Sequence, residues 1–309
     1  MTPQQTTSNL LMVRPASFMF NSETAGSNAF QVNDTSLSSD EIQAKAVIEF
    51  DNFVQLLREN DIAVLVSEDT KDPIKNDAIF PNNWITTHDD GTLVLFPMSS
   101  PSRKFERSAL LLEELEKIFD VKKTVHLEHY EDSGQFLEGT GSMVLDRVHK
   151  ICYACFSNRT NPVILKEWCN IMQYKPICFN AVDGNGQPIY HTNVLMALGE
   201  TFVIICLDTI SDKQELSDIL QHFEGTQKEV ISISIAQMLK FAGNMLQVKN
   251  KDQQKFLVMS NQAFESLNPD QVEQIERHSS ILHPDIKTIE TYGGGSARCM
   301  MAEIFLTKK

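Results

Sequence analysis

The chain has 309 residues, of which 42% are hydrophobic and 22% are charged, and its formal net charge is −14. This composition is typical of a globular protein with a large core. The negative charge argues against nucleic acid and anionic membranes as partners. The sequence shows no apolar stretch of about 20 residues that could span a membrane and no secretory signal. Its six scattered cysteines favour reduced thiols in a cytoplasmic protein.

Five segments have the apolar spacing of amphipathic helices, and most of them begin with a capping residue. Ser38 with Glu41, and Ser211 with Gln214, have the spacing of capping boxes. Two other segments open with an Asn-Pro pair, which suits the first turn of a helix. The predicted helices span residues 39–60, 102–119, 161–172, 211–223 and 268–278.

A short β-rich run follows each predicted helix, and the first four runs lead into a β-hairpin. The fifth hairpin lacks its second strand unless residues 11–18 supply it. The runs span residues 62–66, 123–127, 175–179, 230–235 and 286–290, and the hairpins span residues 82–96, 141–156, 192–206 and 243–259.

Small polar residues recur at the start of the hairpins. Asn83, Ser142, Asn193 and Asn244 are separated by 59, 51 and 51 residues, and a further step of 55 residues leads to Cys299. Periods of this length are typical of repeat architectures. We therefore predict an α/β fold of five ββαβ units with pseudo-five-fold symmetry, in which the N-terminal strand closes the last unit. The alternative is an open α/β sheet in which the spacing is coincidental.

Cys299 is the candidate nucleophile, because it follows three glycines that permit close approach of a ligand. A thiol beside Arg298 could ionise readily and attack a substrate. A buried structural thiol is the alternative. Cys152 and Cys155 form a CxxC pair inside a predicted strand, where residues three apart point to opposite faces. With no second pair in the chain, we expect no metal site.

Three other residues lie where the predicted hairpins begin. His191 could act as a general acid and base for the thiol, or it could be a turn histidine bonded to backbone. Glu138 precedes a glycine-rich turn and could orient a histidine or bind a cation. Asp77 lies on the approach to the shared centre that the repeat predicts. The polar segment 21–36 is interpreted either as a cover over this site or as an exposed surface loop.

The segments FPNNW, EGTGS, SNRT, HTNV and GGGSARCMM together resemble the pentein superfamily. This superfamily contains arginine deiminases, dimethylarginine dimethylaminohydrolases and amidinotransferases. Within it, the sequence is most similar to the bacterial citrulline-hydrolase branch. The resemblance covers the whole chain, and it implies a five-bladed α/β propeller that forms a single catalytic domain over residues 1–309.

The resemblance implies a role for each matching residue. Cys299 would attack the central carbon of a guanidino or ureido group and form a covalent intermediate. His191 would protonate the leaving amine and then activate water, and Glu138 would hold His191 or bond the substrate nitrogens. Asp77 resembles an acidic residue near the substrate. Arg159 resembles the arginine that binds the substrate α-carboxylate, for which a guanidinium is well suited.

Two positions depart from the relatives that bind arginine. Those relatives place carboxylates where this chain has Asn83 and Asn193. An amide can both donate and accept a hydrogen bond, so it suits a neutral urea better than a cation. The sequence therefore favours citrulline, with ornithine, ammonia and carbon dioxide as products. The expected substrate-binding residues are Asp77, Asn83, Arg159, Asn193 and Arg298.

Two alternatives remain at this point. One is an enzyme that acts on arginine or dimethylarginine, or that transfers an amidino group. The other is a non-catalytic binding protein on the same fold, although such relatives lack the Cys, His and Glu set. No cofactor is expected, the expected partner is a small amino-acid substrate, and a homo-oligomer remains open.

Overall fold

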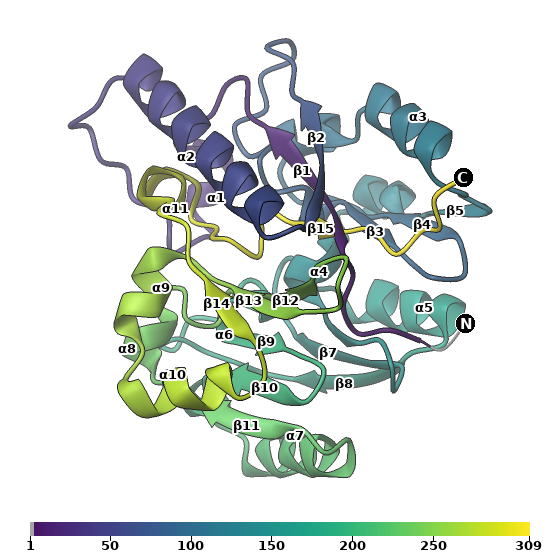
Figure 1. Cartoon of the computed structure of the whole chain (residues 1–309), viewed down its shortest axis with the longest axis vertical. Coiled ribbons are helices and arrows are strands. Elements are labelled where there is room, and N and C mark those ends of the chain that lie inside the picture. Colours follow the sequence, from purple (N-terminus) through teal and green to yellow (C-terminus); the bar gives the residue numbers. More distant parts are fainter. Residues whose placement is uncertain (1–2) are drawn as a thin grey trace.

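The computed structural model describes residues 3–309 and contains five three-stranded sheets (Figure 1). In every sheet the first two strands are antiparallel, and the third strand is parallel to the second. Four of the sheets are formed by β3 (Ile85–Thr87), β4 (Thr92–Leu95) and β5 (Lys123–His126); by β6 (Val144–Asp146), β7 (Ile151–Cys155) and β8 (Lys175–Phe179); by β9 (Met196–Leu198), β10 (Phe202–Ile205) and β11 (Glu229–Ser232); and by β12 (Leu246–Lys249), β13 (Lys255–Val258) and β14 (Ser280–Leu282).

The fifth sheet joins the two ends of the chain. Its strands are β15 (Ala302–Glu303), β1 (Asn9–Arg14) and β2 (Ala63–Glu68). Leu11 of β1 pairs antiparallel with Ala302 of β15. The N-terminal strand therefore completes the last unit, as the repeat predicts, although it lies a few residues earlier than the predicted run. Five separate sheets also rule out the alternative of one open sheet.

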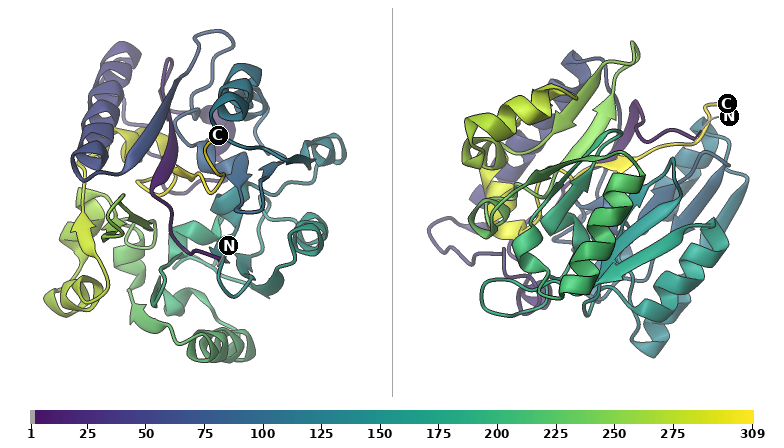
Figure 2. Two further views of the ribbon diagram at one scale, coloured as in Figure 1. Left: turned by 45° about the vertical axis from the view of Figure 1, so that its right-hand side comes forward. Right: turned by 90° about the horizontal axis from the view of Figure 1, so that it is seen from below.

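One longer helix connects the second and third strands of each unit. These helices are α2 (Ser39–Glu59), α3 (Ala109–Ile118), α5 (Pro162–Met172), α7 (Lys213–Gly225) and α10 (Pro269–Glu276). Figure 2 shows them around the outside of the molecule, with the sheets inside. The inner strands of neighbouring units contact each other, β6 with β9, β9 with β12 and β15 with β3. This arrangement resembles the blades of a propeller.

Local capping explains where most of these helices begin. The capping box of Ser38 and Glu41 forms at the start of α2. In α7 the N-cap is Asp212 rather than Ser211, because the Asp212 carboxylate accepts two backbone N–H groups of the first turn. The predicted helix over 102–119 is divided into η2 (Ser102–Glu106) and α3, since Ser108 caps a new helix.

The segment 286–290 was predicted to be a strand, and this prediction is wrong. The third strand of that unit is β14, six residues earlier, and the segment belongs to helix α11 (Lys287–Gly293). Two backbone N–H groups at the start of α11 donate to the carboxylate of Glu49, which belongs to α2. A side chain distant in sequence therefore caps this helix, and local patterns could not reveal that contact.

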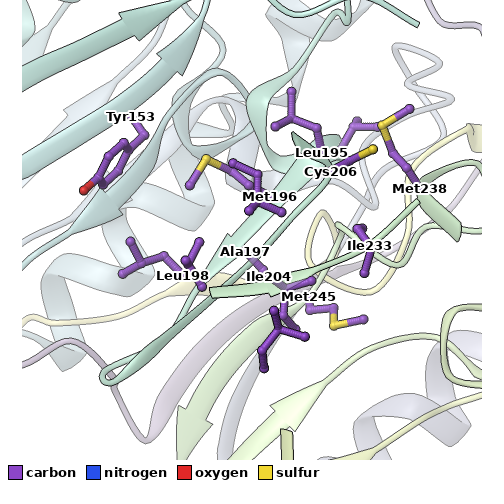
Figure 3. Packing of buried hydrophobic residues seen from close by; sticks show 14 of the residues in the cluster. Tyr153, Leu195, Met196, Ala197, Leu198, Ile204, Cys206, Ile233, Met238 and Met245 are labelled. Atoms are coloured by element: carbon purple, nitrogen blue, oxygen red, sulfur yellow. The ribbon is translucent and has the colours of Figure 1, made fainter. Parts of the chain in front are cut away.

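The buried core extends between the sheets and the outer helices. Figure 3 shows part of its largest cluster, where β9 and β10 contribute Met196, Leu198 and Ile204 next to Met238 and Met245. Such packing fixes the inner strands, and thereby the short elements that precede them. The remaining elements are α1 (Ser22–Ala25), η1 (Pro81–Asn83), η3 (Glu128–Ser133), α4 (Gly139–Ser142), α6 (Thr192–Leu195), η4 (Leu207–Thr209), α8 (Ile235–Met238) and α9 (Asn261–Ser266).

Within residues 3–309, none of the helices combines the length and the apolar character that crossing a membrane would require.

Candidate active site

Short helical turns bring the predicted site residues together in front of the inner strands. Asn83 ends η1, His191 immediately precedes α6, and Cys299 lies in the turn before β15. All three line one cavity. We call it the Cys299 cavity. Its lining residues are Thr24, Asn28, Asp77, Phe80, Asn83, Arg103, Arg159, Tyr190, His191, Gly293, Gly294, Gly295 and Cys299.

The Cys299 side chain is 4% exposed and is surrounded by amide groups. Its sulfur lies 3.3 Å from Nδ2 of Asn244 and 3.5 Å from Nδ2 of Asn193. N–H groups directed at a sulfur stabilise negative charge on it. Asn193 and Asn244, the third and fourth of the periodic polar positions, therefore contact Cys299, the fifth. The repeat predicts that these residues lie together.

The glycines before Cys299 serve close packing. Gly294 has a φ of 61°, and a Cβ there would stand 2.6 Å from Nδ2 of Asn28 and 2.5 Å from Cγ of Gln31. Larger residues would thus strain the backbone and push away the segment that covers the cavity.

Glu138 and His191 form a buried pair. Nε2 of His191 lies 2.9 Å from Oε2 of Glu138, and both side chains are at most 3% exposed. Burial lowers the pKa of His191 to about 4, against the opposing effect of Glu138. Burial alone would raise the pKa of Glu138, but Arg159, His191 and Arg103 together hold it well below its usual range. The pair is therefore an ionised carboxylate with a neutral imidazole at pH 7.

This pairing also settles which nitrogen of His191 is free. Since the Glu138 carboxylate can only accept, Nε2 of the neutral ring carries the hydrogen and donates it. The unprotonated nitrogen is then Nδ1. A Cβ on Gly141 would stand 2.7 Å from that atom, so only glycine lets the chain pack this closely against the His191 ring. An unprotonated Nδ1 can accept a proton.

Ser142, the second of the periodic positions, supports the site from behind. Its hydroxyl donates to the backbone oxygen of Arg159 at 2.6 Å and accepts the backbone N–H of Glu138 at 3.0 Å. The backbone N–H of Ser99 donates to the second oxygen of Glu138 at 2.9 Å. These bonds position the carboxylate before any ligand arrives.

Arg159 borders the cavity with a partly free guanidinium. Nη1 donates to Glu138 at 3.4 Å and Nη2 donates to the hydroxyl of Ser27 at 2.6 Å. The guanidinium carbon lies 4.9 Å from the centre of the Tyr190 ring, in a cation–π arrangement. Nε is buried without a partner in the protein. Arg159 can therefore offer further N–H groups to an anionic ligand.

Several other buried polar atoms of the cavity lack partners in the protein. They are Oδ1 of Asp77 and Nδ2 of Asn83, besides Nε of Arg159. The other oxygen of Asp77 accepts from Asn21 at 2.8 Å, and burial raises the pKa of this carboxyl. Unpaired buried polar groups are costly in a folded protein. Three such atoms, of opposite hydrogen-bonding character, line this one cavity and can be satisfied by a polar ligand.

Arg103 belongs to this site, although the sequence analysis missed it. Its side chain is 3% exposed and bonds Glu106 at 2.8 Å and Oδ1 of Asn83 at 2.8 Å. It lies 4.0 Å from Glu138. The only signal in the sequence was an arginine and a glutamate three residues apart, a pattern that is common on ordinary helix surfaces.

Two predicted binding residues, Asn193 and Arg298, do not line the Cys299 cavity. Arg298 is bonded elsewhere. Its guanidinium donates to Glu303 at 2.6 Å and to the backbone oxygen of Met301 at 2.8 Å. It lines a second cavity, which we call the Arg298 cavity, together with Gln5, Gln247 and Glu303. Adjacent side chains of the turn thus point in different directions. Asn193 borders the Arg298 cavity and reaches the Cys299 sulfur from there.

The segment 21–36 covers part of the Cys299 cavity instead of forming an exposed surface loop throughout. Thr24 and Asn28 are buried and line the cavity. Asn28 donates to the backbone oxygen of Gly294 at 3.2 Å, and Glu23 accepts the backbone N–H of Ser102 at 2.9 Å. The cover interpretation of this segment therefore fits the structure.

No cluster of three or more His, Cys, Asp or Glu side chains in residues 3–309 has the arrangement of a metal site. Cys152 and Cys155 are free, buried thiols in β7.

Solved structures of similar fold were found by comparison. The N-terminal domain of an ArgZ variant, covalently bound to a reaction intermediate, is 15% identical with a TM-score of 0.74, and the match covers 96% of this chain and 97% of that domain. Full-length ArgZ, an arginine dihydrolase from the ornithine–ammonia cycle in cyanobacteria, is 15% identical with a TM-score of 0.74. That match covers 97% of this chain and 41% of ArgZ.

A third structure is a dimethylarginine dimethylaminohydrolase variant with an adduct of S-methyl-L-thiocitrulline. It is 13% identical with a TM-score of 0.64, and the match covers 96% of this chain and 99% of that one. None of the curated proteins matches this chain in sequence. The similarity to these structures confirms the pentein type of fold.

A family model settles the wider identity of the chain. The model described as N,N dimethylarginine dimethylhydrolase, eukaryotic, matches residues 14–306. The match spans nearly all of the sequence, including every residue of the Cys299 cavity. The chain therefore belongs to the N,N dimethylarginine dimethylhydrolase family, a family of hydrolases within the pentein superfamily.

Proposed function

We propose that this protein hydrolyses the ureido group of citrulline through Cys299 and yields ornithine, ammonia and carbon dioxide. The observation that carries the proposal is the neutral amide of Asn83, which lines the Cys299 cavity with an unpartnered N–H group. An N–H group in that position suits the carbonyl oxygen of a urea. A guanidinium has only N–H donors, so it would find no acceptor at Asn83, whose oxygen is bonded to Arg103.

Cys299 would attack the ureido carbon as a thiolate, stabilised by the N–H groups of Asn193 and Asn244. Nδ1 of His191 would take up the proton that the Cys299 thiol loses. A C–N bond then breaks, and the departing nitrogen takes this proton from His191. The product of this step is a thiocarbamate on sulfur. Nδ1 of His191 next accepts a proton from water, which attacks the same carbon and releases the thiolate. The resulting carbamate decomposes to an amine and carbon dioxide.

Glu138 would support both proton transfers. Its carboxylate fixes the orientation and tautomer of His191 through the 2.9 Å bond to Nε2. It also stabilises the imidazolium that forms when Nδ1 takes up a proton. Because the bond partners of Glu138 are already in place, little reorganisation is needed during the reaction.

Arg159 would bind the α-carboxylate of the amino acid. Its unpartnered Nε, buried at the cavity wall, is a donor that a carboxylate can satisfy. Oδ1 of Asp77 would accept N–H groups of the substrate in the same way. Together these atoms provide complementary partners for both ends of a ureido amino acid.

The similar structures are named for arginine or related compounds. The substrate proposed for this chain, citrulline, is therefore different from theirs. ArgZ is named an arginine dihydrolase. If a dihydrolase hydrolyses one guanidino group twice, the first hydrolysis leaves a ureido group. The second hydrolysis must then act on that ureido group. Ureido hydrolysis on a fold of this type is therefore chemically reasonable.

The five sheets would close into a five-bladed ring that forms a single domain over residues 1–309. Contacts between inner strands of neighbouring units support this, as does the sheet that joins β1 to β15. A cytoplasmic location is supported by the six free cysteines, which suit a reducing compartment.

The decisive experiment incubates the purified protein separately with citrulline, arginine and dimethylarginine, and measures ammonia and the amino-acid products. We expect ornithine from citrulline, and kcat/KM for citrulline at least about 10-fold above that for either guanidine. Turnover of arginine or dimethylarginine with none of citrulline would refute the proposed substrate.

A further inference from the structure

Arg103 lies at the wall of the Cys299 cavity, where its guanidinium holds the side chain of Asn83. Nε and Nη2 bond the two carboxylate oxygens of Glu106 at 2.8 and 3.0 Å. Nη1 donates to Oδ1 of Asn83 at 2.8 Å, and Nη2 also donates to the backbone oxygen of Phe80 at 3.1 Å. The two-bond ion pair immobilises the guanidinium and directs Nη1 at the amide.

This contact determines the orientation of the Asn83 amide. A guanidinium has only N–H donors, so the amide has to turn its oxygen toward Arg103. Its nitrogen then points the other way, where it is buried without a partner. A Cβ on Gly141 would stand 2.5 Å from this nitrogen and 2.7 Å from Nδ1 of His191. The N–H donor is thus held beside the histidine.

We propose that Arg103 is a specificity-determining positioning residue, which holds Asn83 as a hydrogen-bond donor and thereby selects a ureido oxygen over a guanidinium. This inference rests on the function proposed above, and it names the group that enforces the substrate class. Without Arg103, the amide could turn and offer its oxygen to the N–H groups of a guanidinium.

The charge of Arg103 acts in the same direction. A guanidinium bonded to Asn83 would lie one amide group away from the buried Arg103 cation. Like charges repel in a site of low polarity, and the ion pair between Arg103 and Glu106 reduces this repulsion. A neutral urea meets no such repulsion.

The test compares variants in which the amide is held and variants in which it is released. In Arg103→Gln/Glu106→Gln the amide is free to turn, and Glu106 is replaced as well so that no unpaired carboxylate is left buried. Glu106→Gln alone is the matched control: it removes the ion pair but keeps the Arg103 donors beside Asn83, where Nη2 is still anchored by the backbone oxygen of Phe80. Asn83→Asp is the positive comparison, since it presents a carboxylate oxygen to the cavity.

The measured quantity is the ratio of kcat/KM for citrulline to kcat/KM for arginine. We expect it to fall at least about 10-fold in Arg103→Gln/Glu106→Gln and in Asn83→Asp, and to stay within about 3-fold of wild type in Glu106→Gln. A constant ratio in the double variant, with both activities lowered together, would overturn the inference and make Arg103 merely structural. A wild-type protein without citrulline turnover would instead refute the proposed function, before any variant is assayed.

Circular dichroism and thermal unfolding show whether each variant is folded. Should the double variant fail to fold, Arg103→Gln alone at pH 6 poses the same question. Burial raises the pKa of Glu106 to about 7, so that carboxyl is largely protonated there. Arg103→Lys serves as the conservative rescue, because an ammonium also has only donors and keeps the amide oxygen facing it. An equal fall of the ratio in the Lys and Gln variants would contradict the orienting role.

Discussion

The Cys299 cavity and the Arg298 cavity are both lined by buried polar side chains, but they differ in how these are paired. In the Arg298 cavity, Glu303 bonds Arg298, and Gln5 and Gln247 use both ends of their amides in bonds within the protein. In the Cys299 cavity, Asp77, Asn83 and Arg159 each keep a buried atom without a partner.

The difference distinguishes a structural polar cluster from a binding site. Buried polar groups that satisfy one another stabilise a particular packing and have little left to offer a ligand. Groups that stay unpaired are tolerated where a ligand can complete them. Oδ1 of Asn193 is an exception, because it borders the Arg298 cavity and has no partner. Apart from that atom, pairing separates the two cavities, and the predictions below compare residues on the two sides.

The largest effect is expected for Cys299→Ala. Removal of the nucleophile should lower kcat by at least about 10,000-fold, because the covalent route is lost. Cys178→Ser is the matched control, since this part-buried thiol lies outside both cavities, and it should retain activity. Mass spectrometry of the quenched wild-type reaction should find the adduct on the peptide that contains Cys299. Activity of Cys299→Ala near the wild-type level would remove the proposed mechanism.

Glu138→Gln should cause the next largest loss. The amide cannot stabilise an imidazolium, so kcat/KM should fall by roughly 100- to 1,000-fold. Glu128→Gln provides the control, because Glu128 forms a pair of the same type with the exposed ring of His126 at 2.7 Å. We expect full activity in that variant. Equal losses in both variants would show that the effect is not specific to the buried pair.

The repeat in the sequence predicts which residues lie together, and the structure places several of them in contact. Cys299, Asn193 and Asn244 lie at equivalent positions of successive units, so the period alone brings them together, as the contacts to the sulfur show. Arg103 escaped notice because it lies outside the repeated turn and reaches Asn83 only through tertiary packing. Arg298 was expected in the site because it neighbours Cys299 in sequence, but neighbouring side chains leave the turn toward different cavities.

The same reasoning explains the outcome for the fold. Strand and helix periods predicted five units, because each unit buries its own apolar face. The helix α11 was missed since its first turn is capped by Glu49, a residue more than 200 positions away. Contacts of that range follow from the fold and cannot be predicted from a local pattern.

Arg159→Met should raise KM for citrulline by about 10- to 100-fold, because a charge-assisted bond to the α-carboxylate is lost. Decarboxylated citrulline separates this role from the contact between Arg159 and Glu138. The wild-type protein should use that substrate poorly, and the variant should lose little further activity on it. Equal losses of activity on both substrates would show that Arg159 acts through its contact with Glu138 and not through the substrate α-carboxylate.

His191 predicts a pH dependence of stability. Its folded pKa of about 4 lies below the value of about 6.5 in an unfolded chain, so the unfolded state binds the proton first as the pH falls. Stability is therefore complete above about pH 6.5 and is lost as the pH falls toward 4. Between pH 7 and pH 5, urea unfolding should show wild type losing about 2 kcal/mol more than His191→Gln. Parallel losses in the two proteins would contradict a neutral, buried His191.

The smallest effect on catalysis is expected for Arg298→Met, which tests the Arg298 cavity directly. Its partner Glu303 also lies 3.5 Å from Arg147, so the carboxylate keeps one cation nearby. We expect a loss of about 1–3 kcal/mol in unfolding free energy, with kcat/KM for citrulline changed by less than about 3-fold. A 100-fold loss of kcat/KM in a fully folded variant would return Arg298 to the binding set. The paired polar groups of its cavity would then have a role that their hydrogen bonds do not reveal.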